Sequence, residues 1–135
     1  MLKKIEYLIP KALDAIDAHL VSKYPVAIPA GYQGAASGFG TTLMQMGLLP
    51  TLAVYTDKDN NADIDRQRLL KTLIAIVKND DRFTSDRDPL NDINTLLRKA
   101  SGQPAAWRKE FTEHLLRASL VFKLTLRTYH LQKPN

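Results

Sequence analysis

Five of the chain's six glycines lie between residues 31 and 47, and this clustering limits the possible folds more than any other feature of the sequence. Phe39, Leu43 and Met46 recur at helical spacing within the segment, although each glycine inside a helix costs about 1 kcal/mol relative to alanine. A glycine lacks a Cβ, so its backbone can lie closer to another helix or to a partner than a larger residue allows. We therefore expect a helix whose glycines lie tightly against a neighbour.

The glycine cluster also resembles a nucleotide-binding loop, but its surroundings argue against that interpretation. Gly38 and Gly40 match the first half of a dinucleotide fingerprint, and the third glycine is missing. The fingerprint follows a strand, whereas residues 24–29 contain two prolines. The pattern of a P-loop is absent as well. We therefore interpret the cluster as a packing feature.

Length and composition favour one cytoplasmic domain that spans residues 1–135. A chain of 135 residues is long enough to bury a single hydrophobic core. It has no cysteine, which excludes disulfides and thiolate metal sites. The first residues lack the apolar run of a signal peptide, and no apolar stretch approaches the ~18 residues that span a membrane.

The net charge of +5 is distributed unevenly along the chain. Residues 1–55 carry four Lys and Arg against three Asp and Glu, and residues 56–92 carry seven against nine. Residues 93–135 carry eight against two. A basic segment within a folded domain favours an anionic partner, nucleic acid first, although a solvated basic face would have the same composition.

Hydrophobic periodicity predicts an all-α fold, a compact single-domain bundle of about five to six helices. The expected helices cover residues 3–22, the glycine-rich segment up to residue 47, and residues 48–56, 64–78, 89–100 and 104–130. Residues 48–56 could also form a strand, but no other segment offers a convincing strand partner. Residues 56–63 and 79–88 are expected to be flexible loops, and residues 131–135 a C-terminal tail.

The polar segment that begins at Asp57 has the alternating pattern of a calcium loop. Oxygen-bearing side chains stand at its odd-numbered positions. Ala62 replaces the glycine that the sharp turn needs, and Arg68 replaces the bidentate glutamate. We therefore expect a polar loop in which Asp63 caps a helix starting at Ile64, and we expect Asp88 to cap the next helix.

The last helix has the most informative distribution of side chains. At 100° per residue, its apolar stripe predicts a core seam of Trp107, Phe111, Leu115, Ala118, Phe122 and Tyr129. The opposite face carries three leucines and three cations, namely Leu116, Leu120, Leu124, Lys109, Lys123 and Arg127. A face that mixes leucines with cations is typical of a surface that binds a partner.

No residue pattern in the chain predicts catalysis. The histidines, His19, His114 and His130, lack metal-ligand spacing, and the motifs of serine hydrolases and zinc proteases are absent. His114 falls at the edge of the core seam. We therefore expect a protein that is not an enzyme and holds neither metal nor cofactor. The alternative, a metal-dependent nuclease, would use Asp57, Asp59 or His114.

One group of residues resembles a known family. The group comprises Ile28-Pro29, Tyr32, Ser37-Gly38-Phe39-Gly40, Met46-Gly47-Leu48-Leu49-Pro50-Thr51-Leu52-Ala53 and Tyr55. It resembles the small all-helical subunit of Cmr-type (type III-B) CRISPR RNA-guided effector complexes. The resemblance covers residues 3–78, and the C-terminal half matches mainly in pattern. Val54 departs from the family, which often has an aromatic residue there.

The resemblance implies a non-catalytic subunit that stacks in several copies beside the subunits that grip the guide RNA, and that helps bind target RNA in antiviral defence. In such complexes, target cleavage belongs to the backbone subunit, and nucleotide-cyclase or DNase activity belongs to the large subunit. The implied partners are the other subunits, further copies of the chain, guide RNA and target RNA. Sequence-independent binding would use Lys and Arg contacts to phosphates.

Two sets of residues are candidates for these contacts. The candidate RNA contacts are Lys71, Lys78, Lys109, Arg117, Lys123 and Arg127. The candidate subunit contacts are Gly34, Gly38, Leu116, Leu120 and Leu124. The alternative is a protein-protein spacer, in which the same cations meet acidic partner surfaces and never touch RNA.

Overall fold

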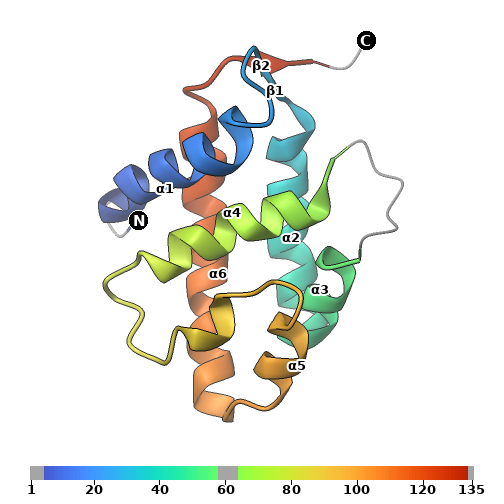
Figure 1. Cartoon of the computed structure of the whole chain (residues 1–135), viewed down its shortest axis with the longest axis vertical. Helices are drawn as coiled ribbons and strands as arrows, with labels where there is room; N and C mark the ends of the chain where they lie inside the picture. Colours follow the sequence, from blue (N-terminus) through green and yellow to red (C-terminus); the bar gives the residue numbers. More distant parts are fainter. Residues whose placement is uncertain (1–4, 58–63, 134–135) are drawn as a thin grey trace.

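The computed structural model describes residues 5–57 and 64–133. Within these ranges, six α-helices and one two-stranded sheet form a compact, mostly α-helical fold (Figure 1). The fold class predicted from the sequence is therefore confirmed. None of the helices in these ranges combines the length and the apolar character that a membrane-crossing segment needs.

The elements follow one another with short connections. The helices are α1 (Ile9–Ile16), α2 (Gly31–Met46), α3 (Leu48–Tyr55), α4 (Arg66–Lys78), α5 (Leu96–Ser101) and α6 (Ala105–Leu126), and the strands are β1 (Ile28–Pro29) and β2 (Leu131–Gln132). Short helical turns, η2 (Glu6–Leu8) and η3 (Asp17–Val21), extend α1 at its two ends, and η4 (Asp88–Leu90) precedes α5.

Helix α6 lies at the centre of the fold. It packs against α1, α2 and α4, and Figure 1 shows it running along the molecule with α2 beside it and α4 crossing in front. The side chains of its predicted core seam are buried from Trp107 to Phe122, and Tyr129 is half-buried against the same core. The 3.6-residue period of the apolar side chains thus identified the buried side of this helix correctly.

Helix α4 begins two residues later than predicted, because Asp65 caps it. The backbone of Asp65 is extended, and its carboxylate accepts a hydrogen bond of 3.1 Å from the Arg68 amide. The predicted cap, Asp63, lies outside the described residues, as do residues 58–62 of the calcium-like pattern and most of the loop predicted at 56–63.

The prediction of a helix at residues 89–100 was wrong for the first half of this range. Only η4 forms there, and α5 begins at Leu96. Between them, the Asp92 carboxylate accepts a hydrogen bond of 2.9 Å from the Asn94 amide, and the Asp92 carbonyl accepts one of 3.2 Å from the Thr95 amide. An aspartate that bonds the backbone two residues on stabilises a turn in place of a helix. Asp88 makes no side-chain cap either.

Helix α6 also ends earlier than predicted, at Leu126, and the chain then pairs with a distant segment. Residues 28–29 and 131–132 form a parallel two-stranded sheet, in which the Ile28 amide donates to the His130 carbonyl at 3.1 Å. The Ala30 amide donates to the Gln132 carbonyl at 2.9 Å. A strand of two residues has no periodicity to detect, so the connector and tail predicted here were wrong at these positions.

Arg87 binds the loop at residues 79–88 to the end of α4. Its guanidinium donates hydrogen bonds to the carbonyls of Lys78 at 3.0 Å, Asp80 at 2.9 Å and Phe83 at 2.6 Å. The guanidinium also lies 5.5 Å from the centre of the Phe83 ring. Phe83 itself is buried against the core. The mobility predicted for this loop stays a prediction.

Candidate nucleic-acid and subunit interfaces

Five of the six candidate RNA contacts lie on two surfaces of the fold, one on α4 and one on α6. Helices α4 and α6 pack against each other, and their inward residues, such as Leu73 and Phe122, belong to the same core. Lys71 projects from the outer side of α4, and Arg127 follows the outer side of α6, both exposed. Since the inner sides of the two helices meet, their outer sides face away from each other.

The outer side of α6 carries the predicted mixture of cations and a leucine, which we call the α6 face. At 100° per residue, Lys109, Leu120 and Arg127 lie within about 20° of one another, with Lys123 about 40° away. Leu120 is 40% exposed. Glu113 is exposed on the same side and reduces the local positive charge.

The predicted leucines of this face are not equally exposed. Leu116 and Leu124 are half-buried and pack against the core, so they border the α6 face without projecting from it. Leu120 alone of the three is exposed. As subunit contacts, all three remain predictions.

Helix α2 lies next to α6, and three of its glycines have no atom closer than an ordinary contact distance. A Cβ at Gly40 would lie 3.6 Å from the Ser119 hydroxyl of α6, an ordinary contact, and a Cβ at Gly34 would have no atom within 4 Å. At Gly38 the nearest atom would be the Tyr55 hydroxyl at 4.0 Å. Gly34 and Gly38 are both exposed. Neither residue packs tightly within the fold, and their role as subunit contacts stays a prediction.

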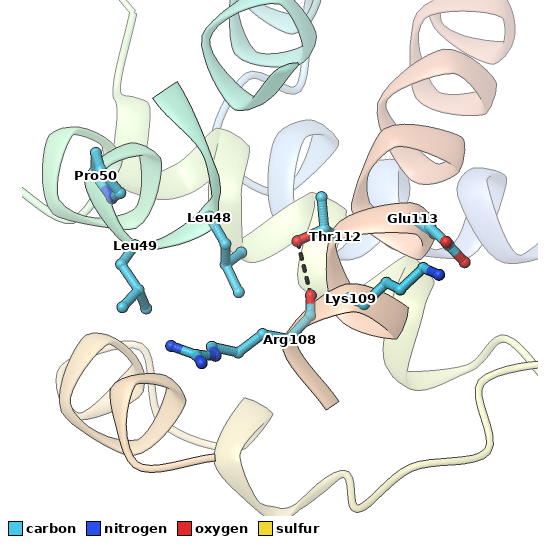
Figure 2. A pocket seen from close by; sticks show the side chains of 7 residues that line it. All are labelled: Leu48, Leu49, Pro50, Arg108, Lys109, Thr112 and Glu113. Carbon is cyan, nitrogen blue, oxygen red and sulfur yellow. Dashed lines mark hydrogen bonds between the residues drawn. The ribbon is translucent and has the colours of Figure 1, made fainter. Parts of the chain in front are cut away.

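A groove of ≈ 520 Å³ lies between the start of α3 and the start of α6. Leu48 and Leu49 point toward it, and the Arg108 side chain extends beneath them (Figure 2). Lys109 and Glu113 lie at its far side, away from the leucines (Figure 2). The sequence reasoning missed Arg108, which lies between the core seam and the α6 face.

A second groove, which we call the α4 groove, crosses the outer side of α4 and has a volume of ≈ 350 Å³. Its lining combines cations, amides and apolar side chains: His19, Lys71, Ile74, Ala75, Lys78, Leu90, Asn91, Asp92, Ile93 and Asn94. Burial lowers the pKa of His19, and the positive charges of Arg68 and Lys71 lower it further. The groove thus brings together two candidate RNA contacts, Lys71 and Lys78, and amides that sequence reasoning missed.

Arg117 belongs to neither surface but to a buried polar cluster. Asp80 is 1% exposed, and its carboxylate accepts hydrogen bonds from the Tyr7 hydroxyl at 3.0 Å and from His114 Nδ1 at 2.9 Å. The Arg82 amide donates to the same carboxylate at 2.9 Å. Arg117 Nη1 lies 3.4 Å from His114 Nδ1. Burial raises the pKa of Tyr7, and the bond to Asp80 raises it further.

Glu110 of α6 binds the loop at residues 79–88. Its carboxylate accepts hydrogen bonds from the Thr84 amide at 2.9 Å, the Thr84 hydroxyl at 2.8 Å and the Ser85 amide at 2.9 Å. Burial acts to raise the pKa of Glu110, but the bonds from Ser85 and Thr84 outweigh it and lower that pKa to about 2.

The nuclease alternative would use Asp57, Asp59 or His114. His114 is buried and bonded to Asp80, and Asp59 lies outside the described residues. In the described part of the chain, no group of three or more His, Asp or Glu side chains is placed to hold a metal ion.

One comparison with known proteins identifies related sequences. The family model described as CRISPR-associated protein (Cas_Cmr5) matches residues 12–123. Among curated proteins and among solved structures, none matches the chain significantly. The matched range includes the glycine-rich helix, the α4 groove and most of α6.

Proposed function

The chain belongs to the Cas_Cmr5 family of CRISPR-associated proteins, and from this we propose that it is a non-catalytic small subunit of a type III-B effector complex. In this proposal, several copies stack along the guide and target RNA in the cytoplasm, and their cations help to bind target RNA. Membership of the family establishes a subunit of a Cmr complex. The stacking, the RNA contacts and the lack of catalysis are the proposed parts.

The observation that carries RNA binding is the set of cations without internal partners. In the described residues, the ion pairs involve Arg68 with Asp65, and His114 with Asp80 and Glu110. The cations of both surfaces pair with no carboxylate of the described residues: Lys71, Lys78, Lys109, Lys123 and Arg127. Their positive charge is therefore available to phosphates, which bind Lys and Arg in any sequence.

Two further observations support a structural role. The most buried acid of the described residues, Asp80, is bonded by Tyr7 and His114, so these groups hold the fold together. Gly34 and Gly38 expose helix backbone that another copy or a neighbouring subunit could approach closely. Exposed Leu120 and Met44, 40% and 76% exposed, add apolar area on the adjacent helices.

The test is a charge reversal on the α6 face within the assembled complex. Replacing Lys109, Lys123 and Arg127 by Glu should weaken capture of target RNA. It should also flatten the dependence of log affinity on log salt by about 2, since each lost phosphate contact to a single strand contributes about 0.7. The affinity is measured by titrating labelled target RNA over a series of salt concentrations.

A matched control variant replaces three exposed cations outside the α6 face by Glu. These are Lys23, Arg98 and Lys99. This control should leave the salt dependence close to that of the unmodified complex, and circular dichroism should show that both variants fold. If the α6 variant binds target RNA like the unmodified complex at every salt concentration, this face does not contact RNA.

The alternative of a spacer subunit is favoured by one observation, the mixture of Leu120 and Glu113 with the cations of the α6 face. Protein interfaces commonly combine apolar and charged side chains in this way. Crosslinking of the assembled complex to photoreactive target RNA separates the two functions. Crosslinks on this chain support RNA binding, whereas crosslinks confined to other subunits support the spacer.

A further inference from the structure

We propose that the α4 groove receives one unstacked base of single-stranded RNA, while Lys71 and Lys78 bind the adjoining phosphates. This inference rests on the proposed RNA-binding function and adds to it a site for a base. The groove is lined by α4, by the turn that precedes α5 and by His19. Its volume of ≈ 350 Å³ falls at the small end of the ~300–1,000 Å³ range of small-molecule pockets.

The two lysines of the groove lie one behind the other along α4. Lys71 and Lys78 are seven residues apart, so they lie on the same side of α4 and about 10 Å apart along its axis. Lys71 is exposed and Lys78 half-buried, and neither pairs with a carboxylate of the described residues. A strand that runs along α4 can meet one lysine on each side of a nucleotide.

Between the lysines, the groove is lined by apolar side chains. Ile74 and Leu90 are 4% and 3% exposed, and Ala75 and Ile93 are half-buried beside them. Ala75 is small, which leaves the space between the lysines open. An apolar floor favours the faces of a base over the charged ribose-phosphate chain, because bases bind by stacking and apolar contact.

The rim opposite the lysines offers groups that bind the edge of a base. Asn91 and Asn94 are exposed and line the groove, and each carboxamide provides two donors and one acceptor. Both residues belong to the turn at Asp92, whose carboxylate accepts a hydrogen bond of 2.9 Å from the Asn94 backbone amide. The Asp92 carboxylate repels phosphates from this rim, so the strand should place its phosphates at the lysines and its base at the amides.

His19 completes the site on the remaining side. It is half-buried, and its carbonyl accepts a hydrogen bond of 2.9 Å from the Arg68 guanidinium. Because burial and nearby cations lower the pKa of its imidazole, the ring is neutral near pH 7. A neutral ring at the rim adds a surface on which a base can stack.

The test fills the groove without changing its charge. Ala75→Leu keeps a good helix former on α4 and occupies the space between Lys71 and Lys78. The full chain is titrated at low salt with labelled oligouridylate and with an abasic ribose-phosphate oligomer of equal length. We expect Ala75→Leu to weaken oligouridylate binding about tenfold, which corresponds to the loss of one stacked base. Binding of the abasic oligomer should not change.

Two control variants make the result specific. Ala53→Leu, at an exposed position of α3, should bind both oligomers like the unmodified chain. Replacing Asn91 and Asn94 by Ala should change the relative affinities for oligouridylate and oligoadenylate by severalfold without altering the salt dependence. Thermal melting should show that all three variants fold.

Several results would overturn the inference. One is an equal effect of Ala75→Leu on both oligomers, and another is no effect on either. Loss of complex assembly in a Lys71→Glu variant that still binds RNA normally would assign the groove to a protein partner. If the unmodified chain binds neither oligomer, the base site is disproved, whereas the proposed function is decided separately by the α6 variants in the assembled complex.

Discussion

At the scale of single residues, the most constrained group is Asp80. It lies in the loop after α4, 34 positions before His114 in the sequence, and its carboxylate is fully enclosed. Tyr7, His114 and the Arg82 amide all donate to it. A buried carboxylate is stable only when such donors replace water, so Asp80 joins the start of the chain, the loop and α6 at one point.

Replacing Asp80 by Ala should therefore lower the free energy of unfolding by about 3–5 kcal/mol, because Tyr7 and His114 would remain buried without a partner. The adjacent Asp81 is exposed. The substitution Asp81→Ala should change the free energy of unfolding by less than about 0.5 kcal/mol. Urea denaturation of both variants measures the difference. Equal effects of the two substitutions would show that the buried cluster does not stabilise the fold.

Prediction of single residues from the sequence succeeded where the helical spacing of apolar residues was sufficient. It failed where the role of a residue depends on hydrogen-bond partners from distant parts of the chain. The buried side of α6 follows from apolar residues at helical spacing, and His114 was placed correctly at its edge. Asp80 could not be found, because it lies in a loop without periodicity and its partners come from two other elements. The same reason explains why the sequence did not connect Arg117 with this cluster.

At the scale of elements, α2 forms a helix despite its glycines because its apolar residues are correctly spaced. Tyr32, Ala36, Phe39 and Leu43 are all buried along one side. The glycines differ in what they do: Gly34 is exposed with free space around it, whereas Gly47 has a φ of 88° and connects α2 to α3. Only Gly47 needs the absence of a Cβ for its backbone conformation.

Alanine substitutions should therefore have opposite effects at these two positions. Gly34→Ala should raise the free energy of unfolding by about 0.5–1 kcal/mol, since alanine favours the helix and meets no neighbour. Gly47→Ala should lower it by about 1–3 kcal/mol, because alanine strains a backbone with positive φ. Chemical denaturation measures both. Stabilisation by Gly47→Ala would contradict the assigned backbone conformation.

Element boundaries were predicted less well than the elements themselves. The errors arise from local hydrogen bonds between side chains and the backbone. Asp65 caps α4, and Asp92 forms a turn, so that α5 begins later than predicted. Several aspartates stand near each of these sites, so the sequence alone does not say which one bonds the backbone. The pairing of β1 with β2 depends on where α6 ends, which periodicity leaves open by several residues.

At the scale of the whole molecule, the two cationic surfaces point in opposite directions. Sequence reasoning identified their residues but could not separate them, because the crossing of α4 over α6 depends on the packing of the entire core. A subunit with partners on two sides can contact RNA on one side and protein on the other. The α4 groove, with its amides, fits RNA, and the α6 face, with its leucine, also fits a protein.

Global stability should depend on pH through Glu110. Its pKa of about 2 lies below the ordinary value of 4.5, so the carboxylate stabilises the fold above about pH 4.5, and this contribution is lost as the pH falls toward 2. Glu110→Gln should thus lower the free energy of unfolding by about 1–2 kcal/mol at pH 6, allowing for solvent screening of a partly exposed group.

The measurement is a series of urea denaturations of the unmodified chain and Glu110→Gln between pH 6 and pH 2. The difference in the free energy of unfolding between the two proteins should become smaller as the pH falls. Glu113→Gln, at an exposed position one turn further along α6, serves as the control and should show no such trend. If this difference in the free energy of unfolding stays constant down to pH 2, the charge of Glu110 does not stabilise the loop at residues 79–88.

The central position of α6 has a consequence for how the protein is made. This helix packs against α1, α2 and α4, and all three precede it in the sequence, so it leaves the ribosome after them. Until then, the nascent chain exposes the apolar sides of the earlier helices, which have no central partner to cover them. The core can therefore close only after α6 has emerged, and a chain that lacks α6 exposes apolar surface of the kind that promotes aggregation.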